Sequence, residues 1–324
     1  MNSRPYYNGW LVLPRLRVQN ANAISSPLTW GFPAITAFLG LMWALERKTR
    51  AETSLAFHGV GVVCHSFTPL VSKGGYTRAF RLTRNPVDHY GATPSIVEEG
   101  RAHMEVSLIF AVGLDGDRQS EEDLKLQAGF VQDVLASQRV AGGSVLPSRF
   151  GPAPFLELMD TPENQGRQFH ELRRRAKLVP GFALVSRPDL LPQRMKDLNG
   201  EQRDASHLEA WLDLSRLNRR AEKTETPEGG SKIEWSPARP KKGWIVPLPI
   251  GYAALTDLYE GGRVKKARDM TTPFRFVESV YSFGEWLGVH RLKNVEDLLW
   301  YGHYDEPGGL YLAQNDYISP SQEI

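Results

Sequence analysis

Residues 19–33 are rich in hydrogen-bonding side chains and carry no charge. The amides and hydroxyls lie at Gln19, Asn20, Asn22, Ser25, Ser26 and Thr29, and Trp30 follows them. Amides both donate and accept hydrogen bonds, which suits them to nucleobase edges or to the backbone of a partner protein. The alternative is an ordinary turn that ends in a helix N-cap, because Asn, Ser and Pro are common turn residues. The local sequence leaves both interpretations open.

Residues 68–98 form a polar stretch, punctuated by Gly and Pro, in which basic side chains alternate with aromatic rings. The polar side chains are Lys73, Arg78, Arg81, Arg84, Asn85 and His89, and the rings are Tyr76, Phe80 and Tyr90. Cations hold phosphates and rings stack on bases, so the pattern favours a projecting arm that binds single-stranded RNA. A surface hairpin that packs on a neighbouring subunit is the alternative.

Two further groups of side chains have chemistry that the sequence leaves ambiguous. On a regular strand Arg101, His103 and Glu105 share one face. They could supply acid–base groups, and an ion-paired sheet surface explains them equally well. Arg268 and Arg275 either bind phosphate or pair with nearby acids. No GxSxG, Walker or HExxH motif accompanies these residues.

The composition is that of a folded chain with nearly balanced charge. Lys and Arg number 39 and Asp and Glu 37, so the net charge of +2 does not by itself indicate nucleic acid. The charges are segregated instead, with an acidic patch at 115–123 and basic clusters at 167–177, 216–223, 239–242 and 263–268. Such clusters either follow a phosphate backbone or form solvated faces.

Cys64 is the single cysteine, which excludes an intrachain disulfide and a cysteine-based zinc cluster and fits a reducing cytoplasm. The N-terminus lacks the apolar core of a signal peptide, and no apolar stretch approaches the ~18 residues of a membrane span. We therefore expect a cytoplasmic protein without a membrane segment.

The first 150 residues alternate strand-like and helix-like patterns. We expect strands at 11–18, with Pro14 at an edge or a bulge, and at 57–67, 101–112 and 142–147, and helices at 34–50 and 121–139. The second helix is expected to have an acidic first turn and a basic last turn, matching the helix dipole. The arm at 68–98, with a short strand at 80–83, is inserted between the second and third strands. The order β-α-β-arm-β-α-β is the ferredoxin-like pattern, which RNA-recognition modules also use.

Residues 151–324 predict a second, α+β region. We expect helices at 163–177, 188–198, 205–218 and 295–301, and strands at 180–186 and 243–250. Residues 272–287 are apolar and aromatic. Residues 219–240 have few apolar side chains and are predicted to form a mobile loop. The chain therefore divides into residues 1–150, with the arm, and residues 151–324.

Eight blocks of sequence carry a resemblance to a known family. In order they are LPRLRVQNANAISSPLTWGFP, FHGVGVVCHSF, FRLTRNP, IVEEGRAHMEVSL, AGGSVLP, LVPGFALVSR, TPFRFVES and LLWYGHYDEPGGLY. Together, from about Leu11 to Tyr311, they resemble the tail-subunit family of the type I-F CRISPR surveillance complex, the Csy complex. That family belongs to the Cas five-type group of the RAMP superfamily.

The resemblance implies a non-catalytic, RNA-binding subunit of an antiviral complex, without a cofactor or metal. Implied partners are the 5′ handle of CRISPR RNA, the large subunit of the complex as a heterodimer, and a backbone subunit of the filament that carries the guide. Target DNA would be met indirectly, through the guide. The implied fold is a ferredoxin-like, RRM-like RAMP domain with an inserted thumb hairpin and a C-terminal α+β extension. The resulting RNA-binding candidates are Gln19, Asn20, Asn22, Ser25, Ser26, Trp30, Arg81, Arg84, Asn85, Arg101, His103, Arg268 and Arg275.

Two other functions remain open at the level of sequence. One is a metal-independent endoribonuclease that processes repeat RNA, with His103 or Tyr76 in acid–base roles and Lys73 stabilising the phosphate. The other is a plain protein-interaction module whose polar segment, 19–33, faces a subunit.

Overall fold

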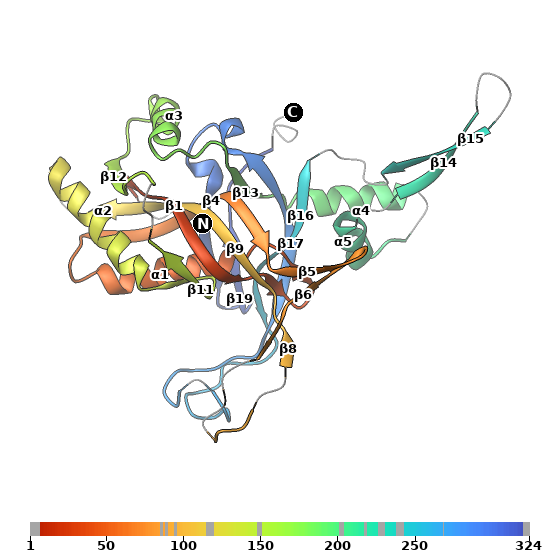
Figure 1. The fold of residues 1–324 in the computed structure, drawn as a ribbon, viewed down its shortest axis with the longest axis horizontal. Helices are drawn as coiled ribbons and strands as arrows, with labels where there is room; N and C mark the ends of the chain where they lie inside the picture. Colours follow the sequence, from red (N-terminus) through yellow and green to blue (C-terminus); the bar gives the residue numbers. More distant parts are fainter. Residues whose placement is uncertain are drawn as a thin grey trace.

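A large antiparallel sheet forms the body of the molecule (Figure 1). The computed structural model describes residues 7–84, 87, 90–93, 96–114, 120–147, 151–200, 204–216, 219–225, 231–237, 243–267 and 269–319. Within these residues eleven strands join in the order β10-β11-β1-β9-β4-β13-β17-β16-β19-β18, with β12 paired to β1. The fold is thus mixed α+β, as predicted.

The strands and helices expected in the first 150 residues are present in the expected order. They are β1 (Gly9–Asn22), α1 (Ile35–Thr49), β4 (Leu55–Pro69), β9 (Arg101–Leu114), α2 (Glu121–Ala136) and β11 (Gly143–Leu146). Short strands β10 (Arg139–Val140) and β12 (Phe155–Leu158) extend the sheet beside them. The acidic first turn of α2 is confirmed, and Ser120 caps it with Asp123 in a capping box. The prediction of a basic last turn is wrong, because α2 ends at Ala136 and Arg139 lies in β10, where it pairs with Ser144 of β11.

Strand β1 continues beyond its predicted end, into the polar segment. It pairs with β9 on one side and with β11 and β12 on the other, so it is not an edge strand. Its register shifts between Leu13 and Leu16, where Arg15 has φ 54°, which confirms the bulge expected at Pro14. A second shift follows Val18, and the rest of the polar segment forms β2 (Ile24–Ser26) and β3 (Thr29–Trp30).

The arm consists of two short antiparallel pairs. β5 (Val71–Gly74) pairs with β6 (Thr77–Phe80), and β7 (Leu82–Arg84) pairs with β8 (Ile96–Glu98). The strand expected at 80–83 is therefore split at Arg81, which lies between β6 and β7.

The chain after residue 150 completes the sheet. It contributes α3 (Gln165–Arg175), β13 (Phe182–Ser186), α4 (Leu190–Gly200), α5 (His207–Ser215), β16 (Trp244–Ala254), β17 (Val277–Gly288), β18 (Leu299–Asp305) and β19 (Leu310–Gln314). β13 and β18 pair with successive segments of β4, at Val63 and Cys64 and at Val60 and Gly61. A Cβ at Gly61 would overlap the Leu298 side chain, so glycine permits this close approach. The division near residue 150 stays a prediction.

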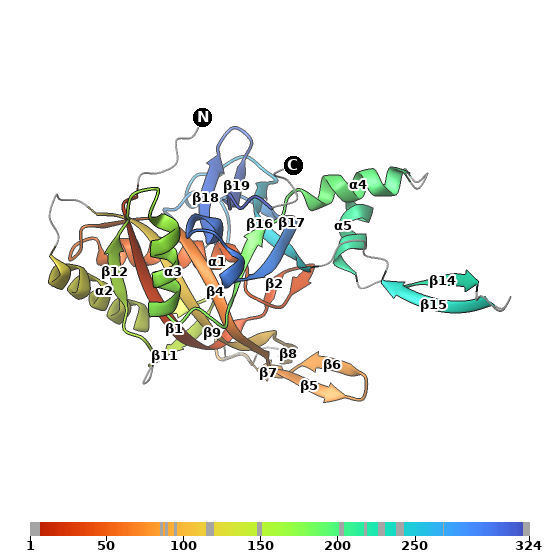
Figure 2. The same cartoon turned by 90° about the horizontal axis from the view of Figure 1, so that it is seen from above.

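Two segments in this part differ from their predictions. The helix expected at 295–301 is reduced to a 3₁₀ turn, Glu296–Leu298, that follows another at Val289–Arg291. From Leu299 the chain enters β18, because pairing with β4 and β19 overrides local helical propensity. The stretch 219–240, expected as a loop, contains the hairpin β14 (Arg219–Glu225) and β15 (Ser231–Pro237), which projects beyond α4 and α5 at one end of the molecule (Figures 1 and 2).

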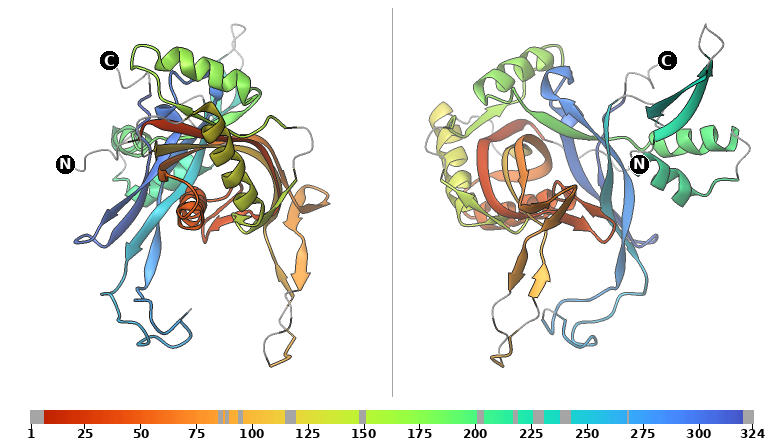
Figure 3. Two further views of the ribbon diagram at one scale, coloured as in Figure 1. Left: turned by 90° about the vertical axis from the view of Figure 1, so that its left-hand side faces the viewer. Right: turned by 45° about the vertical axis from the view of Figure 1, so that its right-hand side comes forward.

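Helices cover both faces of the sheet (Figure 3). Alternate residues of β1 and β9, such as Leu11 and Phe110, pack with α1 and α2 in the larger core. Their neighbours, such as Trp10 and Ile109, pack with α3 in a second core on the opposite face. Within the described ranges, no helix combines the length and apolar character needed to cross a membrane.

Candidate nucleic-acid interface

The C-terminal end of β1 brings two of the predicted residues together. Asn20 has φ 58°, a conformation that Asn tolerates better than most residues, and its backbone N–H donates to Nδ1 of His103 at 3.2 Å. Gln19 pairs with Ser144 of β11. Gln19 and Asn20 are both exposed near the C-terminal end of β1. Their amides are thus available to a ligand.

Asn22 and Arg101 face each other across β1 and β9, and both are held locally. Nδ2 of Asn22 donates to the Ile24 carbonyl at 2.8 Å, and its Oδ1 accepts from the Ile24 N–H at 3.0 Å. Nε and Nη2 of Arg101 donate to Glu99 Oε2 at 3.0 and 2.7 Å. These two residues therefore order the strand end and the base of the arm.

The two serines of the polar segment form a hydroxyl cluster inside the β2–β3 turn. The Oγ atoms of Ser25 and Ser26 each lie 2.7 Å from Oγ1 of Thr29. Ser26 also accepts from the backbone N–H groups of Leu28 and Thr29. The turn interpretation thus holds for these hydroxyls, which order the backbone that carries Trp30.

Trp30 joins the polar segment to the arm. Its ring is 64% exposed and meets Phe80 edge to face, with the ring centroids 5.5 Å apart. Phe80 is the last residue of β6, and exposed Arg81 follows it. The two regions singled out from the sequence, 19–33 and 68–98, are therefore in direct contact.

The β5–β6 hairpin of the arm and Arg81, which follows it, expose positive charge. Lys73, Arg78 and Arg81 are exposed, Tyr76 is fully exposed at the β5–β6 turn, and residues 70–81 contain no Asp or Glu. Arg84 lies in β7, opposite Ile96. Asn85 and Arg268 lie outside the described residues.

Arg275 belongs to the long connection between β16 and β17. It is half-buried and lines a polar hollow of about 410 Å³ together with Asp257 and Glu306. Figure 3 shows this connection and the β7–β8 pair extending from the body in the same direction as two separate projections. Arg275 is therefore placed on a different projection from Arg81.

An aromatic pocket of about 520 Å³, which the sequence did not predict, opens beside Trp30. Trp30 of β3, Phe182 of β13, and Trp244 of β16 line it together with Trp286 of β17. The pairing of β17 with β13 and with β16 brings Phe182, Trp244 and Trp286 together, so no local pattern reveals the pocket. Their one sequence signal is aromatic side chains in strand-like runs.

Two polar side chains that line this aromatic pocket, Cys64 and His65, have hydrogen-bond partners. Nδ1 of His65 donates to the Pro180 carbonyl at 2.8 Å, and the Ser107 hydroxyl donates to its Nε2 at 2.8 Å. Burial lowers the pKa of His65 and raises the pKa of the Cys64 thiol to about 12. Cys64 is therefore a thiol rather than a nucleophilic thiolate at neutral pH.

We expect stability to fall on acidification partly through His65. Its pKa is lower in the folded state than its ordinary value of 6.5, so below pH 6.5 the unfolded chain binds the proton more readily. Urea unfolding of wild type between about pH 7.5 and about pH 5.5 should show this loss, and His65→Gln should make it shallower. His290→Gln, at an exposed site, is the control. Equal pH dependence in His65→Gln and wild type would contradict the prediction.

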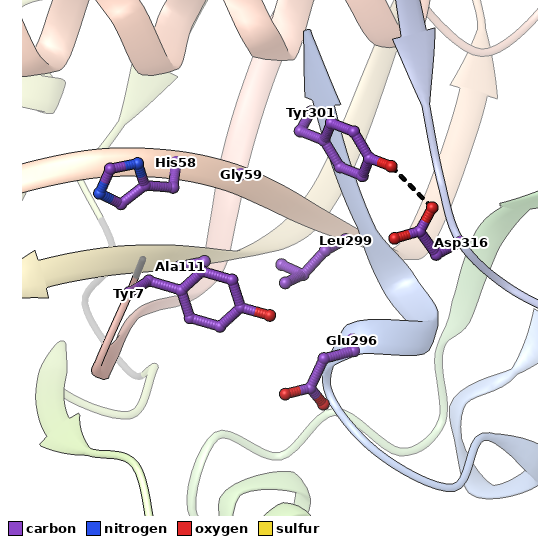
Figure 4. Close-up of a pocket in the computed structure, with 8 residues that line it drawn as sticks. All are labelled: Tyr7, His58, Gly59, Ala111, Glu296, Leu299, Tyr301 and Asp316. Carbon is purple, nitrogen blue, oxygen red and sulfur yellow. Dashed lines mark hydrogen bonds between the residues drawn. The ribbon is translucent and has the colours of Figure 1, made fainter. Parts of the chain in front are cut away.

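A second enclosed cavity is too small for a substrate. Tyr7, His58 and Glu296 line a space of about 30 Å³ in which the Tyr301 hydroxyl donates to Asp316 Oδ1 at 2.6 Å (Figure 4). This volume holds about one water molecule. In the part of the chain that the structure describes, no three His, Cys, Asp or Glu residues cluster as a metal site would require.

Comparisons with known proteins cover nearly all of these elements. A family model described as "CRISPR-associated protein (Cas_Csy2)" matches residues 11–313. A curated protein of Pseudomonas aeruginosa (strain UCBPP-PA14), "CRISPR-associated protein Csy2", is 46% identical over 313 residues, which is 93% of this chain and 93% of that protein. The match extends from β1 to β19 and includes the arm.

Proposed function

Since the chain belongs to the Csy2 family of CRISPR-associated proteins, we propose that it is a non-catalytic RNA-binding subunit of a type I-F surveillance complex. In this role it holds the 5′ handle of CRISPR RNA together with the large subunit, and it caps the filament of backbone subunits that carries the guide. The observation that carries the RNA-binding part is the acid-free, basic stretch 70–81 of the arm, in which Phe80 contacts Trp30.

The strand order supports a ferredoxin-like core with an inserted thumb. The order β11-β1-β9-β4, with α1 and α2 as crossovers, is that of a split β-α-β fold, and the arm between β4 and β9 is the thumb. RNA-recognition modules of this fold bind bases on the open face of the sheet. Here α3 packs over that face, and residues such as Ile109 are buried beneath it. The RNA is therefore assigned to the end of β1 and the thumb instead of the sheet face.

Each part of this interface has a role that its chemistry supports. Lys73, Arg78 and Arg81 contact phosphates, because they are exposed cations on a projecting hairpin. The exposed amides of Gln19 and Asn20 contact base edges. Arg84, Asn85, Arg268 and Arg275 remain proposed phosphate contacts.

The non-catalytic assignment is supported by the state of the candidate acid–base group. Nδ1 of His103 accepts the Asn20 N–H, which leaves only Nε2 for proton transfer. Tyr76 and Lys73 lie on the β5–β6 hairpin, whereas His103 lies in the sheet. His103 is therefore assigned to ordering the strand end beneath the RNA.

RNA affinity as a function of salt tests the proposal. Arg78→Ala/Arg81→Ala, copurified with the large subunit, should bind 5′-handle RNA several-fold more weakly than wild type. The slope of log K against log salt should fall by about 1.4, since each lost phosphate contact on a single strand contributes about 0.7. Arg167→Ala/Arg174→Ala, which removes two exposed cations from α3, should leave the slope unchanged.

Two results would overturn the proposal. One is a wild-type chain that fails to copurify with either RNA or the large subunit. The other is cleavage of repeat RNA by the chain alone in EDTA, which would establish the endoribonuclease function. An unchanged slope in Arg78→Ala/Arg81→Ala would favour the protein-interaction module.

A further inference from the structure

The aromatic pocket beside Trp30 exposes rings that a folded protein ordinarily buries. Trp30 is 64% exposed, Trp244 57% and Phe182 43%, whereas Trp10 and Trp300 in the cores are essentially inaccessible. Three different strands supply these exposed rings around one concave space of about 520 Å³. Concave, largely aromatic sites of this size are typical of ligand pockets.

Neighbouring rings contact Trp244 while more than half of its surface stays exposed. Phe182 meets Trp244 edge to face with centroids 5.5 Å apart, and Trp244 lies 6.1 Å from Trp286 at 45°. Trp286 is nearly buried and anchors the group to the sheet. Trp244 is thus supported on two sides without being covered, so a flat ring can stack on it.

Charge beside the pocket selects the occupant. Phe80 of the thumb touches Trp30, and the adjoining residues 70–81 carry three cations and no acid. An apolar peptide would gain nothing from this charge, whereas a single-stranded polyanion with flat bases satisfies both parts of the surface. Backbone phosphates would follow the thumb while a base enters the pocket.

The pocket offers stacking with little capacity to read a base. Both ring nitrogens of His65 are already bonded, and the Ser25 hydroxyl is engaged with Thr29. Few free polar groups therefore remain to distinguish one base edge from another. Stacking on aromatic rings tolerates any base, because each base has a π face.

We propose that this aromatic pocket takes one unpaired base of the bound RNA, stacked on Trp244, with no strong preference for its identity. The proposal rests on the proposed function, since it requires that the chain bind RNA. It adds a site built from β13, β16 and β17 to an interface otherwise formed by β1 and the thumb.

Abasic substitution along the RNA tests this inference in the copurified complex. Replacing successive handle nucleotides by abasic ones should weaken wild-type binding by about tenfold at one position, the usual effect of losing one stacked base. Trp244→Ala should bind intact RNA about tenfold more weakly than wild type does. The abasic substitution at that position should not weaken its binding further, because the two changes remove the same contact. Trp244→Phe should retain most of the affinity. Changing the base at that position should alter wild-type affinity less than removing it.

Trp235→Ala is the matched control, since Trp235 is similarly exposed but lies on the β14–β15 hairpin. The proposal for the pocket would be overturned if Trp244→Ala bound RNA as tightly as wild type. The proposed function would stand if Arg78→Ala/Arg81→Ala still lowered the salt slope. If Trp244→Ala no longer copurified with the large subunit but kept its RNA affinity, the pocket would hold a protein segment. That result would also overturn the proposal. Absence of RNA binding by wild type would remove the proposed function itself.

Discussion

An Arg187→Met variant is expected to lose about 3–5 kcal/mol of its free energy of unfolding, the usual cost of breaking a buried ion pair from one side. Arg187 follows β13, and its side chain donates to both carboxylate oxygens of Asp189, at 2.9 and 2.8 Å, and to Glu285 of β17. Arg187 and Glu285 are both only 7% exposed. Without Arg187, the Glu285 carboxylate would be buried without its cation.

Urea denaturation at neutral pH measures this loss. The hydrogen bonds that Arg187 donates to Asp189 raise the pKa of Arg187 above its ordinary value of 12.5, so the guanidinium is charged at neutral pH. Arg187→Met/Glu285→Gln should recover part of the stability, because it removes the uncompensated charge. Lys232→Met, in an exposed pair with Glu234, should cost less than about 1 kcal/mol. A loss of that small size in Arg187→Met would show that the cluster is not buried in solution.

A Trp300→Ala variant is expected to lose a similar amount, about 3–5 kcal/mol, through a cavity at the centre of the sheet. Trp300 is fully buried on β18, pairs with Val60 of β4, and donates from Nε1 to the Leu184 carbonyl of β13 at 2.8 Å. It therefore links three strands from both parts of the chain. Trp300→Phe should cost about 1–3 kcal/mol, since it keeps most of the volume but leaves the Leu184 carbonyl without its donor.

Thermal and urea unfolding of the three proteins test this ordering. Trp235→Ala, which changes a mostly exposed ring, should stay within about 0.5 kcal/mol of wild type. Loss of stability confined to one of two separate transitions would indicate that the two parts of the sheet unfold independently. Equal stability of Trp300→Ala and wild type would contradict the packing at this position.

The first half of the fold was predictable because its elements have strong local patterns. Phe38, Leu41, Met42 and Leu45 recur at helical spacing and are all buried in α1. The alternation of Ala102, Met104 and Val106 predicted β9 in the same way, and all three are buried. The errors lie where distant pairing decides the structure. Residues 219–225 and 231–237 pair through their backbones, which requires few apolar side chains, and β18 forms only because β4 and β19 lie beside it.

The candidate site was predictable only in part, for a related reason. Side-chain types indicated Trp30 and Arg81, and the structure places their segments in contact through Phe80. The same types could not show that Asn22 bonds to the backbone of Ile24, or that Ser25 and Ser26 bond to Thr29. Nothing in the sequence indicated that Trp244 and Phe182 lie together, because they become neighbours only through the pairing of β13 with β17 and of β17 with β16.

The pairing of β4 with β13 and β18 has a consequence for synthesis on the ribosome. β9 can cover one edge of β4 as soon as residue 114 has emerged. The other edge stays unpaired until β13 and then β18, with Trp300, have been synthesised. Until then the nascent chain presents Val60 to Cys64 as an open, apolar strand edge, a template for pairing with another chain. We therefore expect slow translation of the second half of the message to lower the yield of folded protein, and a chaperone that covers this edge to raise it.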